Sequence, residues 1–306
     1  MKKTLFLLIS ILTLTAYAEP DKSSWLDQTK KGAVLATKIA LQLNSELGEL
    51  GINGTDIIAE AGKNPAQFRV VVPEHPRKRF IVFSHEHERI IADAFLAEMK
   101  KQGKLYTNAA DEARVRSIAE KIAAVLPEKT PVKVYLLKDE AVNAFCLIDG
   151  SVLVNSGLLK TLQDDNQLAA VIAHEYGHAA ARHGAENLTK LMMKSAGVVY
   201  ISEVAEKNEQ DGKKTKGFLI KLGYGLGSEI GVLLPYHRTM EHEADKLGVL
   251  FMFKAGFDPH AMVDLLETFE KFSPDQDSLW NLLSTHPVNK KRIDHVKAVL
   301  QECCNK

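Results

Sequence analysis

Residues 168–184 read LAAVIAHEYGHAAARHG and place two histidines, His174 and His178, four positions apart. Residues four apart lie on one face of a helix, so the two imidazoles can offer nitrogen atoms to a single cation. Glu175 lies between them in the sequence, where a carboxylate can reach the open coordination position of that cation. The spacing therefore predicts a helix with two ligands of a zinc site, and we expect one Zn²⁺ per chain.

The helix is also predicted without the histidines. Asp164 or Asp165 can cap its start, an apolar stripe follows over residues 168–172, and Gly184 can end it. The competing interpretation is a solvated helix whose histidines hold no metal. Because the helical pattern and the ligand spacing coincide, we favour the metal site.

A second helical pattern, over residues 238–248, offers the missing ligand. Glu241 and Asp245 are four apart and share a face, whereas Glu243 points elsewhere. A ligating histidine usually donates its other ring N–H to a carboxylate, which fixes its tautomer and orientation. We therefore expect Glu241 as the third zinc ligand and Asp245 as the hydrogen-bond partner of a ligating histidine. The alternative is an ordinary solvated acidic face.

Two other classes of zinc site are excluded by the same residues. Metzincins need a third histidine six residues after the second, but that position is Gly184, and His183 is one residue out of register. A structural zinc site would fill all four positions with Cys and His, whereas two His and one Glu leave a position open for water. The ligand set therefore favours catalysis.

Four stretches, spread over about residues 85–300, occur in an order typical of one family. They are residues 143–150 continuing into 152–159, the HEYGH helix with Arg182 and His183, residues 238–248, and Thr285-His286-Pro287 with Arg292. Together they resemble the zinc metalloendopeptidase family of the Ste-type prenyl endopeptidases, HtpX and the Oma-type proteases, in particular its soluble periplasmic BepA, LoiP and YcaL branch. Four ordered motifs are far more specific than one.

The resemblance implies an α+β fold that is mostly helical, with a gluzincin-type catalytic domain and a small β-sheet edging the zinc cleft. The best strand candidates are residues 132–136 and 151–154. In the family the second of these is the edge strand beside the zinc, where an extended peptide can add by main-chain hydrogen bonds. A plain structural hairpin is the alternative. Residues 148–150 replace a Pro-Gly-like turn of the family, so the details of the groove can differ.

The resemblance also places His286 and Arg292 near the zinc. His286 can hold the transition state or occupy the fourth zinc position in a resting state, although a lone His before Pro is commonly a loop residue. In the expected mechanism Glu175 takes a proton from zinc-bound water and passes it to the leaving amine. The oxyanion needs a further donor, for which His286 and Arg238 are the candidates.

The N-terminus has the three parts of a secretory signal peptide. Lys2 and Lys3 precede an apolar run, and Ala16-Tyr-Ala18 forms a cleavage site. We therefore expect cleavage after Ala18 and export to the periplasm, with an uncleaved anchor as the alternative. Residues 217–234 are apolar but contain two charges, so the mature chain is expected to lack a transmembrane segment.

The expected organisation is a signal peptide over residues 1–18, an N-terminal extension over 19–84 and the HExxH metallopeptidase domain over 85–306. Within these, residues 68–72 and 80–83 can form strands around a Pro-rich turn. Helices are expected over residues 25–50, 86–102, 111–125, 259–272 and 293–300. Residues 185–236 begin as a helical continuation and can form a cover near the cleft or pack in the core.

Charge and cysteine content narrow the choice of partners. Lys plus Arg balances Asp plus Glu at 39 each, which gives no electrostatic reason to expect nucleic acid. Three cysteines make no disulfide framework. A bridge from Cys146 to Cys303 or Cys304 can form in an exported chain, but unpaired thiols are favoured, since adjacent cysteines seldom bond to each other.

The sequence thus favours a zinc-dependent endopeptidase that cuts unfolded or misfolded polypeptides. By resemblance only, these substrates are outer-membrane or other envelope proteins, and the protein works with the envelope assembly machinery. The alternative is a periplasmic chaperone or assembly factor with a latent zinc site. A zinc hydrolase of non-peptide substrates is the weakest candidate, because only H-E-x-x-H supports it.

Overall fold

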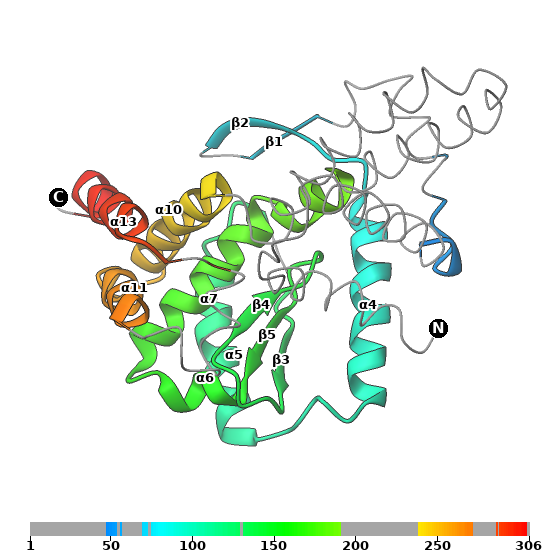
Figure 1. Ribbon diagram of the computed structural model, residues 1–306, viewed down its shortest axis with the longest axis horizontal. Helices are drawn as coiled ribbons and strands as arrows, with labels where there is room; N and C mark the ends of the chain where they lie inside the picture. The colour runs from blue at the N-terminus through cyan, green and yellow to red at the C-terminus, as the bar shows by residue number, and fades with distance from the viewer. Residues whose placement is uncertain are drawn as a thin grey trace, which may run out of the picture. The chain divides into compact units, whose positions relative to one another are not determined.

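The structure is a computed structural model that describes residues 47–53, 56, 69–72, 75–128, 131–190, 238–271, 286 and 288–304 (Figure 1). Its elements are β1 (Arg69–Val72), β2 (His75–Phe80), α4 (His85–Lys101), α5 (Ala109–Ala123), β3 (Val134–Leu137), β4 (Ala144–Cys146), β5 (Val152–Asn155), α6 (Ser156–Thr161), α7 (Asp165–Ala180), α10 (Arg238–Lys254), α11 (Ala261–Lys271) and α13 (Lys290–Cys303). The expected α+β fold, mostly helical with a small sheet, is confirmed.

The chain falls into two compact units. The helix–sheet unit comprises residues 71–77, 88–184 and 236–306, and the second unit comprises residues 1–70, 78–87 and 185–235. In the second unit the buried side chain of Arg79 pairs with Glu186 at 3.4 Å, and the Val82 N–H donates to Thr189 Oγ1 at 3.2 Å. Both contacts join residues 78–87 to residues 185–190, so two distant segments of sequence form one body.

The three-stranded sheet of the helix–sheet unit has the order β3-β5-β4. β5 pairs parallel with β3, with Val134 opposite Val152, and antiparallel with β4, with Ala144 opposite Val154. The expectation that β5 is the edge strand beside the site is wrong, because β5 is central and all four of its residues are buried. Its continuous apolar run suits a strand covered on both faces. Among the described strands, the edge strand on the side of Glu175 is β4, whose Cys146 N–H donates to Glu175 Oε2 at 2.9 Å.

Helix α7 runs between this sheet and the helices α10 and α11 (Figure 1). Asp164 is its N-cap and accepts a hydrogen bond from the Gln167 N–H at 2.9 Å. Every residue from 167 to 178 is buried, so the helix is enclosed all round rather than amphipathic. An enclosed helix holds its polar side chains in a dry, fixed environment.

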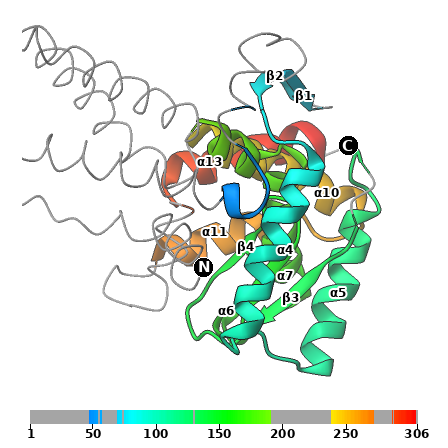
Figure 2. The ribbon, with the colours of Figure 1, turned by 90° about the vertical axis from the view of Figure 1, so that its right-hand side faces the viewer.

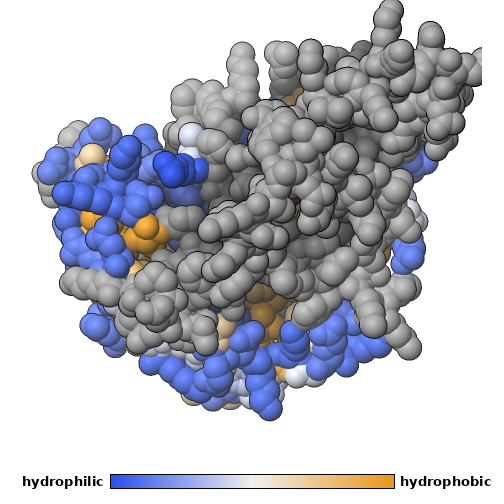
Figure 3. Space-filling model, in the orientation of Figure 1, coloured by the Kyte–Doolittle hydropathy of each residue, from blue (hydrophilic) through white to orange (hydrophobic). Residues whose placement is uncertain are grey.

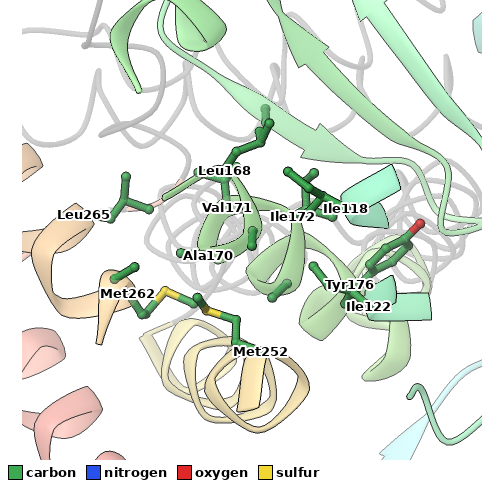
Figure 4. Packing of buried hydrophobic residues seen from close by; sticks show 14 of the residues in the cluster. Ile118, Ile122, Leu168, Ala170, Val171, Ile172, Tyr176, Met252, Met262 and Leu265 are labelled. Atoms are coloured by element: carbon green, nitrogen blue, oxygen red, sulfur yellow. The ribbon is translucent and has the colours of Figure 1, made fainter. Parts of the chain in front are cut away.

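Two groups of apolar side chains enclose α7 (Figure 4). Ile118 and Ile122 of α5 contact one side, and Met252 of α10 with Met262 of α11 covers another. Helix α5 also packs against β3, beside which it lies in the turned view (Figure 2). The core of the helix–sheet unit is therefore built around the helix that carries the H-E-x-x-H spacing.

Helix α7 ends at Ala180, four residues before the predicted stop at Gly184. Arg182 has φ +51°, the left-handed conformation that usually closes a helix at glycine, and residues 183–190 are helical again. The side chain of Arg182 donates twice to Glu88 Oε1, from Nη2 at 2.7 Å and Nε at 3.0 Å. This ion pair holds a conformation that a non-glycine residue rarely adopts.

The other elements follow the sequence with two exceptions. Helices α4, α5, α11 and α13 lie where the patterns predict them, and β1 covers the first expected strand. β2 begins at His75, so residues 75–79 of the expected Pro-rich turn are strand, whereas residues 81–83, expected as strand, lie outside β2. Proline is tolerated in edge strands, and both strands of this two-stranded sheet are edges.

Cys303 and Cys304 form a disulfide and Cys146 is free, so neither the bridge from Cys146 nor the expectation of unpaired tail thiols holds.

Several expectations lie outside the described residues. They are the signal peptide, the helical pattern over residues 25–46, the apolar stretch 217–234 and most of the cover over residues 185–236. None of the helices in the described parts of the chain has both the length and the apolarity of a membrane span. The described surface in view is mostly hydrophilic with small apolar areas (Figure 3).

Close packing joins α7 to α10. A Cβ at Gly177 would lie 2.6 Å from the carbonyl oxygen of Ala244 and 2.9 Å from its Cα. A Cβ at Gly248 would lie 3.2 Å from the backbone nitrogen of His174. Gly177 therefore lets the two helices approach more closely than a side chain permits, and at Gly248 a Cβ would make an unusually tight contact.

We predict that Gly177→Ala lowers the free energy of unfolding by about 1–3 kcal/mol, because backbone atoms of α10 must shift to admit the methyl group. Urea denaturation of the metal-free protein measures the loss. Gly184→Ala is the control, since a Cβ there would lie 3.6 Å from the Ile148 Cα, an ordinary contact. Unchanged stability of Gly177→Ala would contradict the close approach of the two helices.

Candidate metal centre

Four buried side chains converge in the helix–sheet unit. His174 and His178 come from α7, Glu241 from the first turn of α10, and His286 precedes α13. One ligand atom from each lies within 4.8 Å of every other, and the residues are 0–6% exposed. The structure thus brings the two histidines of the sequence motif together with the predicted third ligand and with His286.

Several of these donor atoms lie at the spacing expected between the ligands of one cation. His174 Nε2 lies 3.0 Å from His178 Nε2, 3.2 Å from His286 Nδ1 and 3.6 Å from Glu241 Oε2. Glu241 Oε1 lies 3.2 Å from both His178 Nε2 and His286 Nδ1. A tetrahedron with bonds of about 2.1 Å has edges of about 3.4 Å, and imidazole nitrogen with carboxylate oxygen is a donor set that zinc accepts. The residues therefore fit the ion.

Burial and neighbouring charges prepare the donors for a cation. Burial lowers the pKa of both His174 and His178, which favours the neutral rings whose lone pairs bind metals. Burial alone would raise the pKa of Glu241, but the charge of Arg292, with help from His286 and His178, holds it well below its ordinary value. Glu241 is thus an anion at neutral pH, as a ligand must be.

Asp245 and Arg292 hold the side chains of His174 and Glu241 in place through hydrogen bonds and ion pairs. Asp245 Oδ1 lies 2.9 Å from His174 Nδ1, the contact expected from the sequence. Arg292 donates to both oxygens of Asp245, from Nε at 2.6 Å and Nη2 at 2.8 Å, and its Nη1 lies 2.7 Å from Glu241 Oε2. Burial would raise the pKa of Asp245, but Arg292 holds it far below the ordinary value. One guanidinium therefore fixes the carboxylates of two turns of α10.

The resemblance places Arg292 near the zinc but says nothing of its partners, and the sequence holds a second signal for them. Arg292, Val296 and Val299 share the buried face of α13, so a charged residue occupies an apolar stripe. A buried arginine is paired as a rule, and here its partners are the two acidic residues that the motif analysis had already selected. Arg238, the guanidinium selected from the sequence, is exposed at the first position of α10, and the structure does not bring it into the cluster.

Glu175 faces the same cluster from α7. Its Oε2 accepts the Cys146 N–H at 2.9 Å, and its Oε1 lies 3.6 Å from His286 Nε2. Burial and the adjacent Glu175 raise the pKa of the Cys146 thiol well above its ordinary value, so the thiol stays protonated.

The interpretation of Glu241, Glu243 and Asp245 as a solvated acidic face does not fit the structure, because all three are at most 3% exposed.

We predict that Arg292→Leu lowers the free energy of unfolding of the metal-free protein by about 3–5 kcal/mol, since two buried carboxylates lose their counter-charge. Chemical denaturation measures it. Lys297→Met is the control on the same helix, because the ion pair of Lys297 with Glu267 lies at the surface, where water screens it. Equal losses in the two variants would contradict the role of Arg292.

The region that contains the four clustered residues matches a known protein family. The family described as Peptidase family M48 matches residues 109–300, more than half of the chain. The match begins at α5 and ends within α13, so it contains His174, His178, Glu241 and His286.

Named proteins match over similar regions. The chain is 32% identical over 235 residues to the mitochondrial metalloendopeptidase OMA1 of Schizosaccharomyces pombe, covering 76% of this chain and 66% of the relative. It is 23% identical over 237 residues to the beta-barrel assembly-enhancing protease of Yersinia pestis, covering 77% and 48%. With the Escherichia coli protein of that name it shares 28% identity over 165 residues, covering 54% and 34%. The match therefore spans between a third and two thirds of each relative's length.

Proposed function

This chain belongs to peptidase family M48, and we propose on that premise that it is a zinc-dependent endopeptidase. The observation that carries the proposal is the buried cluster of His174, His178, Glu241 and His286 with Glu175 beside it. Relatives named metalloendopeptidase or protease support the same activity. In the proposed organisation residues 1–18 are a signal peptide, 19–84 an N-terminal extension and 85–306 the peptidase domain.

His174, His178 and Glu241 are the proposed zinc ligands, and Asp245 orients the ring of His174. When bound, the ion supplies Lewis-acid polarisation of the scissile carbonyl and of water. Glu175 acts as general base on the attacking water and then as general acid toward the leaving amine. The Cys146 N–H holds one oxygen of Glu175, which leaves the other to face the reacting groups.

His286 has two proposed roles. It supplies the fourth donor in the structure, so this arrangement is a resting state in which His286 takes the position that water needs. Its Nε2 lies 3.6 Å from Glu175 Oε1 in this position, so once the ring leaves the ligand set it is the proposed donor to the oxyanion. Burial would lower the pKa of His286, but in this position Glu241 and Glu175 raise it. Arg238 is the other proposed donor, although it is exposed in this state.

The proposed substrate is an extended segment of an unfolded polypeptide. β4 is the edge strand beside Glu175, and an edge can pair with a peptide backbone without regard to its sequence. Relatives named for β-barrel assembly support envelope proteins as substrates and the assembly machinery as a partner, and the N-terminal signal pattern supports the periplasm. The fourth donor His286 also favours the second candidate, a chaperone that binds such segments while its zinc site stays latent.

We predict that Glu175→Gln retains zinc but loses casein cleavage by at least about 10²-fold, the share that a general base contributes. His178→Ala and Glu241→Ala should lose both zinc and cleavage. Elemental analysis and a casein assay on the purified mature chain measure the two properties. Tyr176→Phe, on the same buried helix, is the control for effects of substitution alone. Cleavage by Glu175→Gln at the wild-type rate would contradict the mechanism, and zinc without cleavage in the wild type would favour the chaperone.

We predict that His286→Ala retains zinc, because three ligands remain. Its rate of casein cleavage separates the two proposed roles: cleavage faster than the wild type marks a blocking role, because the fourth position is open to water, and slower cleavage marks the loss of an oxyanion donor. The comparison is made at equal zinc occupancy. Loss of zinc from His286→Ala would show instead that His286 is an obligatory ligand and that the structure is not a resting state.

A further inference from the structure

His183 lies outside the H-E-x-x-H spacing but contacts the metal centre. Its Nδ1 lies 2.9 Å from His178 Nδ1, and its Nε2 lies 3.2 Å from Glu243 Oε2. The side chains of all three residues are at most 1% exposed. The hydrogen-bond chain from Glu243 through His183 therefore ends on the ring nitrogen of His178 that faces away from Glu241.

The two proposed ligands of α7 are thus supported by different chemistry. His174 contacts a carboxylate, Asp245, at its outer nitrogen, whereas His178 contacts a second imidazole. A carboxylate only accepts hydrogen bonds, but an imidazole accepts at one nitrogen and donates at the other. The direction of the bond at His178 is therefore set by what His183 does at its own far nitrogen.

Glu243 settles that direction. As a carboxylate it accepts a proton from His183 Nε2, which leaves Nδ1 of a neutral His183 bare. Bare Nδ1 can only accept, so His178 must carry its proton on Nδ1 and present the lone pair of Nε2. His178 Nε2 is the atom that lies 3.2 Å from Glu241 Oε1 and 3.0 Å from His174 Nε2, within the donor cluster.

We propose that His183, held by Glu243, is a positioning residue that fixes the tautomer and ring orientation of His178 for metal binding. The proposal rests on the proposed zinc site. The proposal gives a role to His183 and Glu243, which are neither proposed zinc ligands nor the proposed general base. Neither residue touches the substrate or the reacting atoms.

The backbone is shaped to make this contact. Residues five apart on one continuous helix are about 140° apart around its axis, so His183 would point away from His178 if α7 ran on. The left-handed conformation of Arg182 breaks the helix after Ala180 and returns His183 to the side of His178. The ion pair of Arg182 with Glu88 holds this break in place. The strained residue thus serves the position of the next one.

The test is the zinc dissociation constant, measured by competition with a chromophoric chelator. His183→Leu should bind zinc about 10–100-fold more weakly, the cost typical of losing the partner of a ligating histidine. His183→Asn should recover most of the affinity, because its Oδ1 can stand where Nδ1 stood and accept from His178. Tyr176→Phe is the buried control and should match the wild type. Equal affinities of His183→Leu, His183→Asn and the wild type would overturn the proposal.

A second measurement needs no substitution and therefore survives failure of a variant to fold. Long-range ¹H–¹⁵N correlation spectra of the zinc-loaded chain report which ring nitrogen of each histidine carries a proton. We expect His183 protonated on Nε2 and His178 on Nδ1; His183 protonated on Nδ1 would overturn the proposal. Failure of the wild type to bind zinc at all would refute the proposed function itself, which distinguishes the two failures.

Discussion

The close approach of α7 and α10 is the constraint on which the site depends. Gly177 admits the backbone of α10 at Ala244, and Gly248 admits that of α7 at His174, so the backbones of the two helices lie close together at both points. His174 and His178 are more than sixty positions from Glu241 in the sequence, yet their donor atoms lie 3.2–3.6 Å from its oxygens. Burial of the apolar side chains around α7 stabilises this arrangement of the donor atoms.

The site buries two carboxylates, which is unfavourable in free energy, and Arg292 of α13 offsets this by its positive charge. Glu241 and Asp245 would be strongly unfavourable in the core without Arg292, which neutralises one charge of the pair and leaves the other for a cation. Arg292 Nη1 also donates to the carbonyl oxygen of His286 at 3.3 Å. Arg292 therefore contacts both the acidic residues around the proposed ligands and the backbone of His286, the fourth donor.

The sequence predicts the local parts of this arrangement well and the long-range parts poorly. The spacing of His174 and His178, and of Glu241 and Asp245, follows from helical periodicity, which is a property of neighbouring residues. The order of strands and the contacts of Arg292 and His183 depend on which elements meet in space, and no local period encodes that. β5 shows the difference: its residues predict a strand, but only the pairing with β3 and β4 reveals that it is central. Arg182 likewise gives no local sign of the left-handed conformation that a distant Glu88 supports.

The central claim is that α7, α10 and the segment before α13 together build one zinc centre from nitrogen and oxygen donors. X-ray absorption at the zinc edge of the purified, zinc-loaded mature chain tests it most directly. The account predicts one zinc per chain with only nitrogen and oxygen neighbours, at about 2.0–2.1 Å, and a scattering pattern of several imidazoles. A sulfur neighbour at about 2.3 Å, which would have to come from a cysteine such as Cys146, or a chain that retains no zinc, would contradict it.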